Sequence, residues 1–151
     1  MGFWDQLKSS VTQIGQKLET EIARFRNKEF AEAAMAACAL VTAADGTIDE
    51  AERRRTAEFI GRHPAMQAFP VAELQARYTD YCSKLTTDFD FAKIELMQLI
   101  GKLRSKPDQA RAIVQVAIVI GGADGSFSEE ERKVVREACQ ALGLNPAEFD
   151  L

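Results

Sequence analysis

The sequence contains little that would cross-link, kink or anchor a chain. Among 151 residues there are four prolines, three cysteines and one histidine. Three cysteines cannot all pair within one chain, and Cys38, Cys82 and Cys139 are too far apart in sequence for a clustered zinc motif. A reducing, cytoplasmic environment is the simplest interpretation. A chain of this length that is 46% hydrophobic can bury one core without disulfides or metals.

Basic excess and long apolar runs are also missing. The chain has 19 Lys and Arg against 23 Asp and Glu, a net charge of −4, which argues against nucleic acid as a partner. The N-terminus MGFWDQLK has neither a basic leader nor a continuous apolar stretch, so no secretory signal is expected. The longest apolar run, 112–120, is interrupted by Gln115 and is far shorter than the roughly 20 residues that span a bilayer. We expect a soluble protein with no membrane span.

The N-terminal segment has a pattern of its own. Its apolar residues recur at alternating steps of three and four, a narrow helical seam made of Trp4, Leu7, Val11, Ile14, Leu18, Ile22 and Phe25. This predicts an amphipathic helix over 3–27 that packs on the domain, pairs with a partner helix or lies on a membrane surface. The last option is weakest, because acidic residues offset the basic ones. We divide the chain into an N-terminal amphipathic extension, 1–28, and a helical domain, 29–151.

The rest of the chain is typical of a series of helices. Breakers at Asp45-Gly46, His63-Pro64 and Asn145-Pro146 separate them, and His63 is expected to end a helix rather than to catalyse a reaction. The residues expected to supply core in the fourth helical segment are Phe91, Ile94, Leu96, Leu99, Ile100 and Leu103. The predicted segments are 29–43, 49–62, 70–82, 88–103, a helix from 107, and a short turn from 146.

An internal repeat predicts the fold class. Residues 44–52 read ADGTIDEAE and residues 123–131 read ADGSFSEEE, 79 residues apart. An apolar segment precedes each copy, Ala-rich at 33–41 and β-branched at 112–120. The second could be a strand by itself, but the first is helical by propensity, so the repeat predicts helices in both. We expect an all-α fold: a compact bundle of about seven helices built from two duplicated helix–loop–helix units, preceded by the N-terminal helix.

The repeated loops have the pattern of helix caps. Each places a glycine at the end of one helix and, before the next, an N-cap residue followed three positions later by a glutamate: Asp49 with Glu52, and Ser128 with Glu131. This pattern leaves Asp45 and Asp124 without a role.

The same residues match the second half of an EF-hand calcium loop. With Asp45 at loop position 5, Gly46 falls at 6 and Glu52 at 12. Loop positions 1 and 3 carry no side-chain oxygen in either copy, so a normal EF-hand site cannot form. Half of a ligand set remains in each loop, and two loops facing each other could hold a divalent cation. Caps alone and caps with a metal therefore both remain open.

At these loops the chain resembles the tellurite-resistance protein B family, TerB. The D-G-x-[IF]-x-x-x-E loops, their 79-residue spacing and the chain length are similar to that family, most clearly over 29–151. The resemblance implies a compact helical bundle in a cytoplasmic bacterial protein that takes part in resistance to tellurite and related stresses. It also implies a divalent cation (Ca²⁺, Mg²⁺, Mn²⁺ or Zn²⁺) held by the acidic loops, at Asp45, Asp49, Glu52, Asp124 and Glu131.

Direct binding of tellurite by these loops is unfavourable, because tellurite is an oxyanion and the loops carry carboxylates. We expect a non-enzymatic, cation-dependent scaffold or adaptor that recruits other tellurite-resistance proteins, including membrane-associated ones. The protein would then be cytoplasmic, or peripheral to the inner membrane through a partner. The alternative is a thiol-dependent enzyme acting on tellurite. Cys38 and Cys139 are expected to be buried, and Cys82, near a predicted helix end, is the one candidate for a reactive thiol.

Overall fold

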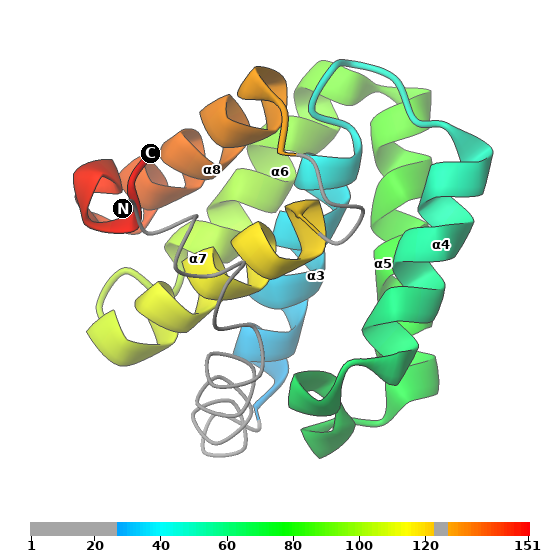
Figure 1. Ribbon diagram of the computed structural model, residues 1–151, viewed down its shortest axis with the longest axis horizontal. Helices are drawn as coiled ribbons and strands as arrows, with labels where there is room; N and C mark the ends of the chain where they lie inside the picture. The colour runs from blue at the N-terminus through cyan, green and yellow to red at the C-terminus, as the bar shows by residue number, and fades with distance from the viewer. Residues whose placement is uncertain (1–26, 123–126) are drawn as a thin grey trace.

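The computed structural model describes residues 27–122 and 127–151 and is helical throughout those ranges (Figure 1). Within them, six α-helices and two short 3-10 turns follow one another, with no strand. The α-helices are α3 (Lys28–Thr42), α4 (Glu50–Arg62), α5 (Val71–Thr87), α6 (Phe89–Gly101), α7 (Pro107–Gly121) and α8 (Glu129–Ala141). The turns are η1 (Pro64–Ala68) and η2 (Pro146–Phe149). The all-α prediction is confirmed, and the ambiguous segment 112–120 lies inside α7.

Helices α3 and α4 recur as α7 and α8 at the spacing of the loops. α3 covers 28–42 and α7 covers 107–121, while α4 covers 50–62 and α8 covers 129–141, so every bound is displaced by the same 79 residues. The predicted N-terminal helix, 3–27, lies outside the described residues apart from Asn27, which caps α3 by accepting a hydrogen bond from the Phe30 N–H at 2.8 Å. No helix in the described ranges is both long enough and apolar enough to cross a membrane.

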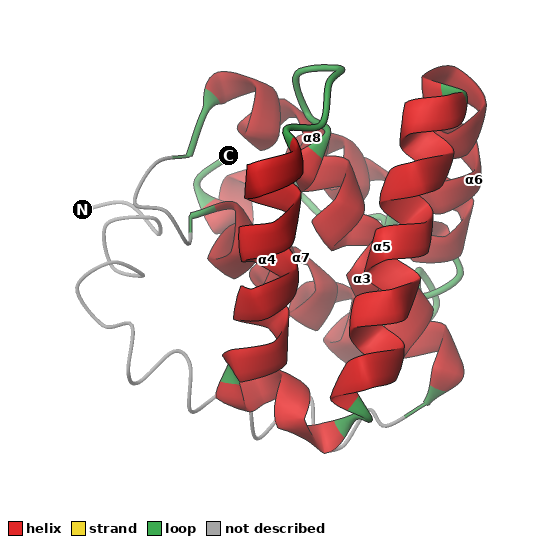
Figure 2. Cartoon of the chain, turned by 90° about the vertical axis from the view of Figure 1, so that its right-hand side faces the viewer, coloured by secondary structure: helices red, strands yellow, loops and turns green. Residues whose placement is uncertain are grey.

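The core is built around α3, which lies among α5, α6 and α7 (Figures 1 and 2). Twelve of its 15 residues are buried. Six of those 15 are alanines, whose small side chains let helices approach from several directions. A buried polar contact joins α3 to α5: the Thr42 hydroxyl donates to the Cys38 carbonyl at 3.0 Å and lies 2.7 Å from the Tyr78 hydroxyl. Because the single Thr42 proton goes to Cys38, Tyr78 is the donor to Thr42.

Two expectations for α5 and α6 are wrong. α5 continues to Thr87 instead of ending near residue 82. A single residue, Asp88, both ends α5 and caps α6, where its carboxylate accepts from the Phe91 N–H at 3.3 Å. Phe91 and Ile94 are 66% and 60% exposed and do not belong to the core. The buried face of α6 follows steps of four (Ala92, Leu96 and Ile100), and the two exposed residues fall between those steps.

Candidate functional site

The loop after α3 is a tight turn in which Asp45 has a structural role. Gly46 adopts φ +90°, a left-handed conformation that favours glycine, and its N–H donates to the Ala43 carbonyl at 2.9 Å. The Asp45 carboxylate accepts from both the N–H and the hydroxyl of Thr47, each at 3.1 Å. This exposed turn accounts for the aspartate that the capping pattern left unassigned.

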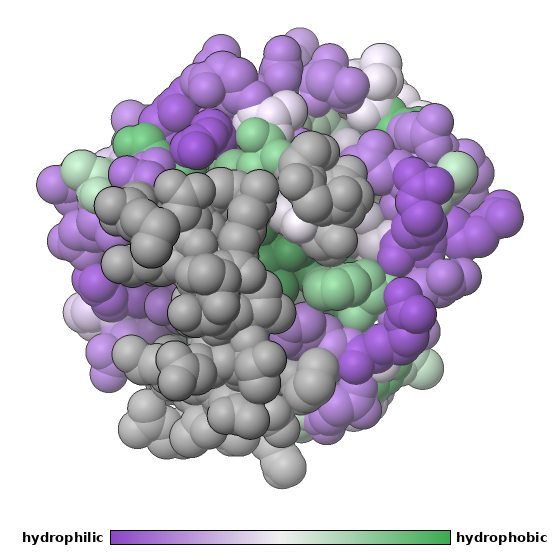
Figure 3. Space-filling view, in the orientation of Figure 1, coloured by the Kyte–Doolittle hydropathy of each residue, from purple (hydrophilic) through white to green (hydrophobic). Residues whose placement is uncertain are grey.

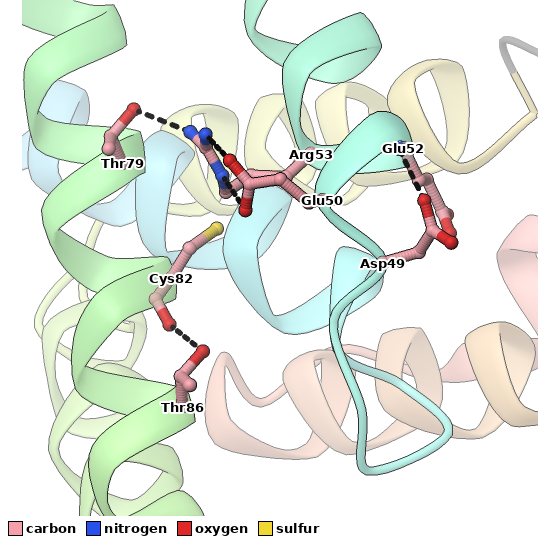
Figure 4. A network of polar contacts seen from close by, with 7 residues as sticks. All are labelled: Asp49, Glu50, Glu52, Arg53, Thr79, Cys82 and Thr86. Atoms are coloured by element: carbon pink, nitrogen blue, oxygen red, sulfur yellow. Dashed lines mark hydrogen bonds and ion pairs between the residues drawn. The ribbon is translucent and has the colours of Figure 1, made fainter.

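Both helices that follow the repeated loops begin with the predicted caps. The Asp49 carboxylate accepts from the Glu52 N–H at 2.9 Å (Figure 4). In the second copy the capping box is complete: Ser128 Oγ accepts from the Glu131 N–H at 3.1 Å, and Glu131 Oε1 accepts from the Ser128 N–H at 3.0 Å. Asp124 and Gly125 lie outside the described residues. The capping interpretation is therefore confirmed at Asp49 and at Ser128.

The two units meet at one pocket of about 290 Å³. Glu52 at the start of α4 and Glu131 at the start of α8 both line it. The ends of α3 and α7 contribute residues that are also equivalent under the 79-residue spacing: Val41 and Thr42, Ile120 and Gly121. In the space-filling view, apolar side chains are visible in the hollow between α7 and α4 (Figure 3). The structure thus brings the two predicted glutamates to one place.

The remaining pocket residues lie along α4: Arg55, Thr56, Glu58, Phe59 and Arg62. Among the described residues, Arg55, Glu58 and Arg62 form no ion pair, whereas Glu50 with Arg53 on α4 and Glu129 with Arg136 on α8 do. Arg53 pairs with Glu50 and lies 3.5 Å from the Thr79 hydroxyl of α5, on a different side of α4 from Glu52 (Figure 4). The pocket therefore has two carboxylates at its loop end and unpaired charges of both signs along the α4 wall.

The described carboxylates do not by themselves complete a metal site. No group of three or more His, Cys, Asp or Glu side chains in 27–122 and 127–151 is arranged to hold a metal ion. Asp45 and Asp49 are exposed and do not line the pocket, since their carboxylates face the Thr47 and Glu52 backbone. Asp124 lies outside the described residues. Of the five predicted ligands, Glu52 and Glu131 are the pair that the described structure brings together.

The three thiols are all buried. Cys82 lies inside α5 instead of near a helix end, so it is not the exposed, reactive thiol that we considered from the sequence. Burial raises the pKa of the Cys82 and Cys139 thiols to about 11 each, and burial together with the nearby Cys82 raises the pKa of Cys38 further. A thiol kept neutral in this way is a poor nucleophile. His63 ends α4, as predicted, and its N–H donates to the Phe59 carbonyl at 2.9 Å.

Sequence reasoning missed the α4 wall and the role of Gly121. Arg55, Phe59 and Arg62 recur at steps of four and three and so share one helical face, a signal that was available in the sequence. A Cβ at Gly121 would lie only 2.5 Å from the Phe127 ring and 3.1 Å from Val41. Gly121 therefore lets the segment before α8 pack against the end of α7, beside the pocket.

Comparison with known proteins identifies the family of this chain. The family model described as "Tellurite resistance protein TerB" matches residues 31–151. A curated relative, "Tellurium resistance protein TerB" from Alcaligenes sp, is 28% identical over 122 residues, which cover 78% of this chain and 97% of the relative. No solved structure gives a significant match. Because the family model covers nearly all of the described helical domain, the chain belongs to the TerB family of tellurite resistance proteins.

Proposed function

We propose that this chain contributes to tellurite resistance as a cytoplasmic, divalent-cation-binding scaffold that recruits other resistance proteins, membrane-associated ones among them. One observation carries the proposal: Glu52 and Glu131, which occupy equivalent positions in the two units, line the same pocket. Each glutamate also lies in the first turn of a helix, where the helix dipole favours its negative charge.

A cation would relieve the repulsion between these two carboxylates. Ca²⁺ prefers six to eight oxygen ligands and Mg²⁺ six, so two glutamates need additional oxygens. Asp124 is the best-placed supplement from the sequence, because it occupies the loop that precedes Glu131. Asp45 and Asp49 would add negative charge nearby, with backbone carbonyls and water filling the remaining positions. Arg55 on the pocket wall opposes the cation, so the affinity is expected to be modest.

The thiol-dependent alternative has weaker support. A thiol that reduces tellurite must reach the oxyanion as a thiolate, and Cys38, Cys82 and Cys139 are buried with raised pKa values. A scaffold makes no such demand on the thiols.

Thermal unfolding of the full chain in EDTA, and then with Ca²⁺, Mg²⁺, Mn²⁺ or Zn²⁺, tests the proposal. At a metal concentration ten times Kd, binding to the folded state stabilises it by about 1.4 kcal/mol, a rise in Tm of roughly 3–6 °C. The double variant Glu52→Gln/Glu131→Gln should lose this response. Its apo fold should be retained, because glutamine also serves at the third position of a capping box.

Glu129→Gln is the matched control, since it removes one carboxylate from the first turn of α8 outside the pocket. It should leave the metal response unchanged. A double variant at Glu52 and Glu131 that responds to metal like the wild type would contradict the assignment of the site.

A further inference from the structure

A groove follows α4 because this helix packs chiefly against α5 and only lightly against α3 and α7. The "α4 groove" is the pocket described above, extended along its wall: its floor is Val41, Thr42, Ile120 and Gly121, and its wall is Arg55, Glu58, Phe59 and Arg62. Ile60 is the one buried residue of α4. One face of the helix packs on α5, and the face that lines the groove, with Arg55, Glu58 and Arg62 exposed, is only partly covered by the described residues.

We propose that the amphipathic helix predicted over residues 3–27 folds back and docks in the α4 groove of its own chain. This inference goes beyond the proposed function and does not depend on metal binding. It names the occupant of a groove that has a mostly apolar floor and a wall whose charges form no ion pair with the described residues.

The position of Asn27 supports this docking. Its backbone is extended, with φ −138° and ψ 161°, so α3 does not continue backwards through it and the preceding chain can turn there. Phe30 in the first turn of α3 stacks on Phe69, just after η1, with ring centroids 6.1 Å apart. The start of α3 therefore lies at the same end of the bundle as Arg62, where α4 ends (Figure 1). A helix that turns back at Asn27 enters the groove at its Arg62 end.

The groove wall on α4 and the last part of the predicted N-terminal helix have the same length. Ten residues separate Glu52 from Arg62, which is about 15 Å at the 1.5 Å rise of an α-helix. The ten residues before Asn27 cover the same distance, and their seam residues Leu18, Ile22 and Phe25 would face Phe59 and the apolar floor. The earlier half of the helix would continue past the pocket.

The charges also match in this register, in which the docked helix runs parallel to α4. Counting back from Asn27 and from Arg62 at the same rise places Glu19 and Glu21 level with Arg55. It likewise places Lys17 level with Glu52, and Arg24 one residue from the level of Glu58. Arg55 and Glu58 on the groove wall, and Glu52 at its loop end, thereby each have an opposite charge within one residue of their level, while Arg62 is level with the uncharged Asn27. Such matching sets the register of a docked helix more than its affinity.

The first experiment measures hydrogen exchange of residues 50–62 in the full chain and in Leu18→Asp/Ile22→Asp, which removes the seam without touching the folded domain. Docking shields α4, so exchange of its exposed amides should be severalfold faster in the variant, with α5 and α6 unchanged. Equal exchange on α4 in the two proteins would overturn the proposal.

The second experiment tests the register with tryptophan fluorescence. Trp4 is the single tryptophan, so Trp4→Phe/Leu18→Trp places one probe on the seam. Its emission should be blue-shifted and protected from acrylamide. Arg55→Glu should raise quenching severalfold, and adding Glu19→Arg/Glu21→Arg should restore protection. Arg54→Glu, a charge reversal on α4 outside the groove, is the matched control and should have no effect.

The fluorescence measurement also distinguishes two other possibilities, binding of a second copy of the chain in the groove and binding of the N-terminal helix to a membrane. Protection that grows with protein concentration would assign the groove to a second copy. Protection seen only with anionic lipid vesicles would assign the N-terminal helix to a membrane surface. Either result would overturn docking within one chain.

Discussion

The α3–α4 and α7–α8 units have equivalent helix bounds, and their second helices both begin at a side-chain N-cap, yet these second helices are buried very differently. α8 buries Val134, Val135, Ala138 and Cys139, whereas α4 buries Ile60. The residues of α4 that are equivalent to the first three are Arg55, Thr56 and Phe59, and all three line the groove. Caps and loop glycines therefore set where a helix begins and ends, while the choice of residues on one face decides whether it closes onto the bundle.

The largest effect should come from placing the same charge at equivalent positions of the two helices. Val134→Asp puts a carboxylate in the core face of α8 and should lower the free energy of unfolding by about 3–5 kcal/mol, because the buried charge has no partner. Arg55→Asp, at the equivalent exposed site of α4, should change it by less than about 0.5 kcal/mol. Urea unfolding measures both. Similar losses would mean that α4 packs as tightly as α8.

An intermediate effect is expected at the caps, where the units are alike. Ser128→Ala and Asp49→Ala should each cost about 1 kcal/mol in urea unfolding, because each leaves an N–H of the first helical turn without its acceptor. Asp49→Asn keeps the acceptor and should be close to neutral. A loss at Asp49→Asn equal to that at Asp49→Ala would show that its charge matters more than its cap.

The smallest effect should come from the two exposed ion pairs. Hydrogen bonds from Arg53 and Arg136 lower the pKa of Glu50 and of Glu129, respectively. A carboxylate whose folded pKa is lowered stabilises the fold above its unfolded pKa, and that stabilisation is lost as the pH falls through the folded value. Glu50→Gln and Glu129→Gln should therefore be slightly less stable than the wild type at pH 7, and the difference should shrink as the pH falls through the folded pKa. A difference that does not change with pH would point to lost packing instead of lost charge.

Features that depend on a few neighbouring residues could be predicted from the sequence. The turn at Gly46, the caps at Asp49 and Ser128, and the helix over 112–120 follow from local chemistry and the repeat. The exposure of Phe91 and the burial of Cys82 could not be predicted, because they depend on which helix packs on which face. The α4 groove could not be predicted for the same reason. Its floor comes from α3 and α7 and its wall from α4, so no single segment of the sequence indicates the whole groove.

The burial of Cys38, Cys82 and Cys139 turns these thiols into reporters of conformational opening. An oxidant or a thiol reagent can reach them only in molecules whose helices have separated, so the rate of modification equals the open fraction multiplied by the intrinsic rate for an exposed thiol. Each loss of about 1.4 kcal/mol in the opening free energy increases that rate tenfold. The lifetime of this protein in an oxidising environment is therefore set by the packing of its core, and any variant that loosens α3 or α5 shortens it.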